Sequence, residues 1–236
     1  MVADDWTMLN DPEFRDQWLF MYKYDNRRRM VAKKVPGAGE VFMIYDGFNR
    51  VVLTQDANMR SNDIVTDDLI LNSYDKSTYL IGEGGSVTLK PNFTTEGHGA
   101  FLASTDPAKV NANKWMFTKY DGQNRPVITG ALYTEGDYEE MLAAVEAHED
   151  FTERYDGSGD FYGYSNTAFP DASNPGEVEV LTVTYYDSYQ FLEDLSWPAQ
   201  YEYAGGRPLA RGHQTGSLIK TLGTSDFLYS SVWYDA

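Results

Sequence analysis

The dipeptide Tyr-Asp recurs along the chain and constrains its fold more than any other feature of the sequence. It occurs seven times in 236 residues, far more often than this composition would give by chance. Three copies continue in the same way, with three turn-prone residues, an arginine and then a strand-forming segment. Because a repeated sequence unit indicates a repeated structural unit, the fold is expected to be built from copies of one element. The three matching units are 24–29, 45–50 and 120–125.

Each unit predicts a β-hairpin. The aspartate can accept a hydrogen bond from the backbone two residues further on, which starts a turn. Gly47 or Gly122, and Asn49 or Asn124, can adopt the positive φ that a short hairpin loop needs. The arginine then opens the return strand, where we expect its stem to lie over the tyrosine of its own hairpin and its head to pair with the aspartate. One such hairpin is marginally stable alone, so a row of them is expected to form a continuous sheet.

These residues resemble the YD-repeat (Rhs-type) proteins of Bacteroidetes, and the resemblance covers most of the chain. Segments 51–56 and 125–130 resemble the strands that follow the family's turns, and 179–191 resembles a further unit. Segment 212–222 resembles a linker to a last repeat that begins at Phe227 and lacks its arginine half. The chain is therefore expected to be an internal fragment of a longer protein. The residues that carry the motif are Tyr24, Asp25, Arg29, Tyr45, Asp46, Arg50, Tyr120, Asp121, Arg125, Tyr186, Asp187, Tyr234 and Asp235.

The resemblance implies a mainly β fold, a curved antiparallel sheet of hairpins that forms an open section of an Rhs-type shell. It implies a non-catalytic structural role, since full-length relatives enclose a C-terminal, toxin-like polypeptide in such a shell. The expected partners are the rest of a longer YD-repeat chain, that enclosed polypeptide, or further copies joined through open sheet edges. An exported or cell-surface location follows from the resemblance alone. The alternative is a cell-envelope module that binds carbohydrate or protein.

The spacing of the units divides the chain into three parts. Hairpins are expected in 1–61 and 107–236, and the long interval between the second and third units predicts an inserted β module in 62–106. Segment 137–148 is rich in helix-forming residues and predicts one short helix, with Asp137 as its N-cap. Its apolar residues fall at helical spacing. They are Tyr138, Met141, Leu142 and Val145.

Composition limits the partners. Lys and Arg number 19 against 36 Asp and Glu, which gives a formal net charge of −17. Nucleic acid is not expected as a partner, because such a chain repels phosphate. No apolar stretch reaches the roughly 18 residues of a membrane span. The absence of cysteine excludes disulfides, thiolate metal sites and a cysteine nucleophile.

The sequence offers no clear catalytic constellation. His98, His148 and His213 lie far apart and match no metal-binding spacing. The carboxylates are abundant, but no pair is singled out as an acid and a base. Ser158 has flanking glycines without the spacing of a nucleophile turn. No catalytic, cofactor-binding or metal-binding residue is therefore expected. Calcium bound by acid pairs and sugar stacked on exposed aromatic rings remain open alternatives.

Overall fold

The computed structural model describes residues 12–60, 64–65, 69–71, 78–81, 87–91, 93–94, 102–104, 113–158, 161–173, 176–202 and 209–234.

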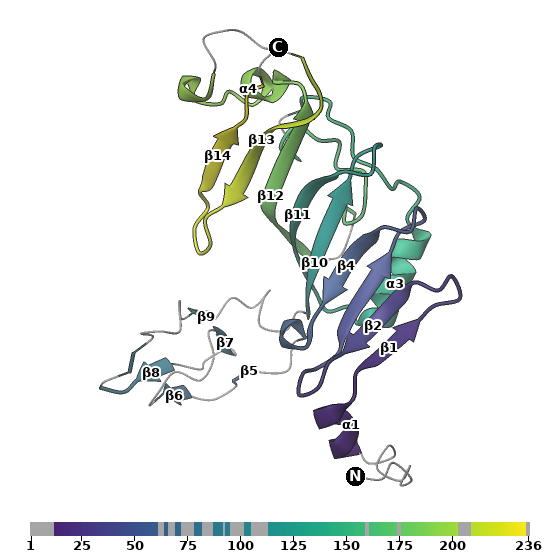
Figure 1. The fold of residues 1–236 in the computed structure, drawn as a ribbon. Coiled ribbons are helices and arrows are strands. Elements are labelled where there is room, and N and C mark those ends of the chain that lie inside the picture. Colours follow the sequence, from purple (N-terminus) through teal and green to yellow (C-terminus); the bar gives the residue numbers. More distant parts are fainter. Residues whose placement is uncertain are drawn as a thin grey trace.

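The chain is mainly β, and its main body is one nine-stranded antiparallel sheet. The strands lie in the order β1-β2-β3-β4-β10-β11-β12-β13-β14. Figure 1 shows that the sheet twists strongly from β1 at one edge to β14 at the other, as right-handed strands require. Apart from the insertion between β4 and β10, the spatial order follows the sequence. The strands are β1 (Met21–Tyr24), β2 (Met30–Lys34), β3 (Val41–Tyr45), β4 (Val51–Gln55), β10 (Asn113–Tyr120), β11 (Pro126–Thr134), β12 (Glu177–Asp187), β13 (Ala210–Lys220) and β14 (Phe227–Ser231).

One face of the sheet carries the core. Along β10 the buried residues alternate, so that Trp115, Phe117 and Lys119 are buried while the residues between them are only partly buried. This period of two is what a half-buried strand produces. The same face holds stacked rings, among them Tyr185 on Phe191 with centroids 4.3 Å apart. The aromatic residues of the sequence therefore serve mainly as core.

Three α-helices occur in the described part of the chain. The predicted helix forms as α3 (Tyr138–Ala147), with Asp137 as N-cap in a capping box with Glu140. Met141 and Val145 are buried, which confirms the predicted apolar stripe. Two shorter helices, α1 (Pro12–Trp18) and α4 (Gln190–Asp194), were not expected from the sequence. The 3₁₀ turn η2 (Ala57–Met59) follows β4, and the 3₁₀ turn η4 (Ala199–Tyr201) follows α4.

The 62–106 segment holds strands that pair with one another in parallel. One group joins β5 (Ile64–Val65), β7 (Thr78–Ile81) and β9 (Leu102–Ser104), and another joins β6 (Leu69–Leu71) and β8 (Val87–Leu89). Within the described ranges none of them pairs with the nine-stranded sheet.

One assignment from the sequence is wrong. Segment 212–222, interpreted as a linker, lies mostly in β13, the return strand of β12. Its glycines hid the strand pattern. Gly216 is required in place, because a Cβ there would overlap the ring of Phe191. The long connection between β12 and β13, residues 188–209, also made this hairpin hard to predict from the sequence.

Candidate functional site: a ladder of tyrosine, aspartate and arginine

The motif residues of the first three hairpins form the same turn. In the second hairpin the backbone N–H of Asn49 donates to the carbonyl of Asp46, and the N–H of Asp46 donates to the carbonyl of Arg50. Asn49 has φ of 64°, so the turn ends in a left-handed residue, as in three-residue hairpin loops. The equivalent residues are Arg28 and Asn124, each with φ of 63°. The asparagine prediction is confirmed, whereas Gly47 and Gly122 do not take a positive φ.

The aspartate organises each turn with both of its oxygens. Asp46 Oδ1 accepts the backbone N–H groups of Phe48 and Arg50, both at 2.9 Å. Its Oδ2 accepts Arg50 Nε at 2.7 Å, which confirms the predicted aspartate–arginine pair. The same side-chain bond occurs in the other two hairpins, where Asp25 accepts from Arg29 Nε and Asp121 accepts from Arg125 Nε.

The arginine does not lie over the tyrosine of its own hairpin, as the sequence suggested. The guanidinium carbon of Arg29 lies 4.8 Å from the centroid of Tyr45, and that of Arg50 lies 4.8 Å from Tyr120. Arg125 lies 4.3 Å from the ring of Tyr186. Each cation is thus stacked on the next hairpin. The cause is the hydrogen bond from Nε to the aspartate of the same turn. With Nε held there, the guanidinium group extends toward the next hairpin.

Two further contacts join neighbouring repeats. The hydroxyl of Tyr45 donates to the carbonyl of Met30 at 2.8 Å, and that of Tyr120 donates to the carbonyl of Val51 at 2.9 Å. Arg50 Nη1 reaches the side-chain oxygen of Asn124 at 3.1 Å. We call this series of contacts between hairpins the ladder. A ring, a cation and two hydrogen bonds therefore link residues that lie up to 74 positions apart in sequence.

We call each step of the ladder a rung: one aspartate–arginine pair and the tyrosine of the next hairpin. The middle rung, formed by Asp46, Arg50 and Tyr120, is the most buried. The side chains of Arg50 and Asp46 are 9% and 3% exposed, against 20% and 22% for Arg29 and Asp25. Arg50 also donates to the carbonyl of Phe151, which belongs to the segment that covers the core face. The middle rung therefore fastens this covering segment as well as the next hairpin.

The third rung, which joins Arg125 to the hairpin of Tyr186, differs from the first two. Arg125 pairs with both oxygens of Asp187, at 3.1 and 2.6 Å. The hydrogen bond from Arg125 is the main reason that the pKa of Asp187 is lowered, and the pKa of Arg125 is raised by the same pair. For Asp25, partial desolvation opposes the shift, but hydrogen bonds from Arg29 and its charge lower the pKa.

His213 stands in the position of an arginine in this fourth repeat. It follows Gly212, a residue with positive φ like Asn49 and Asn124. Its ring lies 4.7 Å from that of Tyr234, whose hydroxyl donates to the carbonyl of Gln214 at 2.7 Å. Sequence reasoning missed this equivalence because 24 residues separate Asp187 from Gly212. Asp235 lies outside the described residues.

Among the described residues, the Tyr-Asp dipeptide at 155–156 takes no part in the ladder. Tyr155 belongs to the aromatic core and Asp156 accepts the N–H of Ser158 in a local turn. Tyr74 and Asp75 lie outside the described residues.

A buried ion pair also escaped the sequence analysis. Lys119 Nζ lies 2.9 Å from Glu153 Oε1, and both side chains are fully buried. Asn166 accepts a second hydrogen bond from Lys119, and backbone N–H groups of Thr167 and Ala168 donate to the carboxylate. Desolvation lowers the pKa of Lys119, although Glu153 opposes the shift. The alternation of Trp115 and Phe117 along the strand is the signal that could have placed Lys119 on the buried face.

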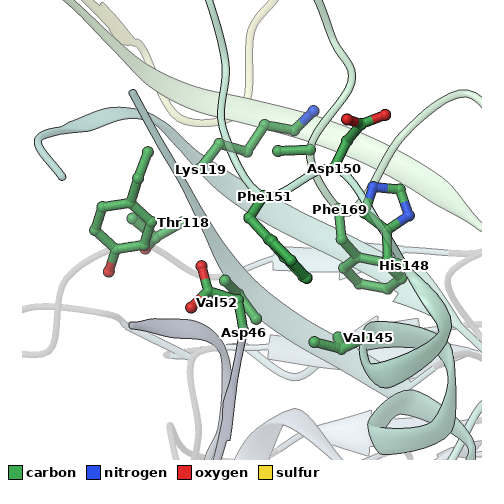
Figure 2. A pocket seen from close by; sticks show the side chains of 11 residues that line it. Asp46, Val52, Thr118, Lys119, Val145, His148, Asp150, Phe151 and Phe169 are labelled. Carbon is green, nitrogen blue, oxygen red and sulfur yellow. The ribbon is translucent and has the colours of Figure 1, made fainter. Parts of the chain in front are cut away.

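The cavity beside the middle rung is small. Its volume is about 10 Å³, the space of a single water molecule. Figure 2 shows that the carboxylates of Asp46 and Asp150 do not converge, since they lie on different sides of Phe151. Both oxygens of Asp46 are already engaged by the turn. This arrangement offers no paired acid and base to a substrate.

A shallow groove near α3 has a volume of about 220 Å³ and is lined by Phe42, Gln55, Arg60, Asn113, Asp137, Tyr138 and Glu139. In the described ranges, no three histidine, aspartate or glutamate side chains gather as a metal site would need. None of the helices in these ranges has the length and apolarity of a membrane crossing.

A scan against protein-family models, a search of curated proteins and a search of solved structures each found no match for the chain.

Proposed function

We propose that the chain is a non-catalytic structural segment, part of a YD-repeat (Rhs-type) shell or surface scaffold. The observation that carries the proposal is the ladder, in which each arginine binds the aspartate of its own turn and stacks on the tyrosine of the next hairpin. The aspartate, arginine and tyrosine of the motif bind one another, so their role is to stabilise the sheet. Mechanically, each added hairpin is fastened to the previous one by its backbone pairing and by one rung.

The wall is proposed to enclose a polypeptide that belongs to the same longer protein. Among the described residues, one face of the sheet is covered by α3, by residues 150–158 and 161–173 and by α4. The opposite face is the one proposed to meet the contents or solvent. On that opposite face Thr129 and Thr182 meet, with their hydroxyl oxygens 2.7 Å apart. An exported or cell-surface location is part of the same proposal.

Protease protection tests this function. The longer protein of which this chain is proposed to be a segment is produced whole, together with the neighbouring polypeptide that the shell would enclose, and is then treated with a protease. We expect the neighbouring polypeptide to survive in the wild type and in the exposed control Arg154→Gln. It should be cut rapidly in Arg50→Gln, which removes the middle rung. Equal digestion of the polypeptide in all three proteins would reject enclosure.

A second candidate function is a binding module for carbohydrate, and one observation favours it. Four aromatic residues at alternate positions around β1 are more than half exposed. They are Trp18 at 66%, Phe20 at 63%, Tyr22 at 51% and Tyr24 at 61%. Exposed rings can stack on the apolar faces of sugars. Retardation of the wild type, but not of a Tyr22→Ala and Tyr24→Ala variant, in gels that contain soluble polysaccharide would support this candidate.

A further inference from the structure

Lys119, Glu153 and Asn166 bring an amine, a carboxyl group and an amide together in the core. Lys119 Nζ lies 2.9 Å from Glu153 Oε1 and donates a hydrogen bond to Asn166 Oδ1 at 2.6 Å. The side chains of Lys119 and Glu153 are fully buried, and the ring centroid of Phe161 lies 4.6 Å from Nζ. A buried ion pair needs only the amine and the carboxylate. The amide adds a carbonyl carbon that a lysine amine can attack.

This carbonyl carbon lies within reach of the amine. Because a C=O bond is about 1.2 Å long, Cγ of Asn166 can be no further than about 3.8 Å from Lys119 Nζ. Atoms that are poised to react lie about 3–3.5 Å apart, so a small movement of either side chain is enough. Among the described residues, no hydrogen bond holds Asn166 Nδ2, the group that an attack on Cγ would expel.

Glu153 also holds the loop that carries the amide. Asn166 has φ of 51°, a backbone conformation that asparagine adopts more readily than most residues. The neighbours of Asn166 in sequence are bound to the carboxylate of Glu153, which fixes the amide beside it. These bonds come from the hydroxyl of Ser165 at 2.8 Å, the N–H of Thr167 at 3.3 Å and the N–H of Ala168 at 3.0 Å.

Burial favours the uncharged forms of the amine and the acid. Charges that are removed from water are costly, and transfer of one proton from Lys119 to Glu153 converts the ion pair into a neutral amine and a carboxylic acid. Desolvation lowers the pKa of Lys119, although the charges of Glu153 and Asp171 oppose this shift. The neutral amine is the nucleophilic form of lysine.

We propose that Lys119 and Asn166 join in an intramolecular isopeptide bond, with Glu153 as the proton carrier. Nζ of the neutral lysine attacks Cγ of the asparagine and forms the new C–N bond. Glu153 takes the proton that Nζ loses and supplies a proton to Nδ2. The bond between Cγ and Nδ2 then breaks and ammonia leaves. An amine and an amide thus give a substituted amide and ammonia, without an oxidant, a reductant or a cofactor.

The bond would fasten β10 covalently to the segment 161–173, across 47 positions of sequence. Each molecule reacts once, on itself, so the reaction is a self-modification without turnover. The inference goes beyond the proposed structural role and does not depend on it, because the ladder contains none of the three reacting residues.

Mass spectrometry of the full 236-residue chain tests the bond. We expect the wild type to weigh less than its sequence by one ammonia, about 17 Da. Trypsin does not cut after an acylated lysine or before proline, so it should release 115–154 and 155–211 as one linked peptide. A wild type of full mass would overturn the inference. Loss of ammonia with Lys119 still cut would do the same, because cyclisation of an asparagine to a succinimide gives that result.

Three variants identify the reacting groups. Lys119→Met removes the nucleophile, and Glu153→Gln removes the proton carrier. Asn166→Gly removes the amide and keeps a residue that accepts the positive φ. We expect each variant to have the full mass of its sequence, whereas the control Lys114→Met on the same strand should still lose ammonia. Loss of ammonia in Lys119→Met would contradict the assignment, and a linked peptide in Glu153→Gln would exclude Glu153 as the proton carrier. Far-UV circular dichroism establishes the fold of each variant, and the linked peptide of the wild type decides the question without them.

Discussion

At the scale of single residues, we expect the contribution of each rung to the free energy of unfolding to increase with its burial. Arg50→Gln leaves Asp46 buried without its cation, so we expect it to lower the free energy of unfolding by about 3 kcal/mol. Arg29→Gln removes a more exposed pair and should cost less than about 1 kcal/mol. Urea unfolding of both variants gives the comparison. Equal losses at the two positions would show that burial does not grade the ladder.

Arg28 occupies a strained position in the first turn. Its φ is 63°, where the other two turns have asparagine. A left-handed conformation costs a typical side chain roughly 1–2 kcal/mol, and asparagine adopts it more readily. We therefore expect Arg28→Asn to raise the free energy of unfolding by about 1 kcal/mol. Asn49→Arg is the reciprocal variant and should destabilise by a similar amount in the same assay.

At the scale of elements, the buried pair of Lys119 and Glu153 fastens the 150–173 segment to β10. Removing one partner leaves a buried charge, so Glu153→Gln should destabilise the protein by about 3 kcal/mol. Lys119→Met together with Glu153→Gln should cost less than the sum of the single changes. Thermal or urea unfolding of the three variants closes this cycle. Strict additivity would contradict a direct interaction.

The sequence predicts the hairpins well because their causes are local. Aspartate, a left-handed asparagine and arginine act within six residues, so the turns of 45–50 and 120–125 could be predicted. The ladder could not be predicted, because Arg50 and Tyr120 are separated in sequence by the 62–106 insertion. They meet only because β4 pairs directly with β10. β13 was missed for a related reason, since Gly212 and Gly216 break the alternation of side chains. Glu153 lies 34 residues from Lys119, and no local pattern joins them.

At the scale of the whole molecule, acid should weaken the sheet through its carboxylates. The pKa of Asp187 is lowered in the folded state by its hydrogen bond with Arg125, from an ordinary value of 3.8. Its contribution is therefore complete above that value and is lost as pH falls below it. We expect stability to drop between pH of about 4 and 2. Asp187→Asn should show a smaller drop in urea-unfolding midpoint over this range.

The proposed structural role requires that the rungs couple one hairpin to the next. A double-mutant cycle of Arg50→Met and Tyr120→Leu measures that coupling directly, because the cost of leaving Asp46 unpaired cancels. The ladder predicts a coupling energy of about 1–2 kcal/mol between these residues of different repeats. A coupling energy within about 0.3 kcal/mol of zero would contradict it, and the hairpins would then be held together by backbone pairing and core packing alone.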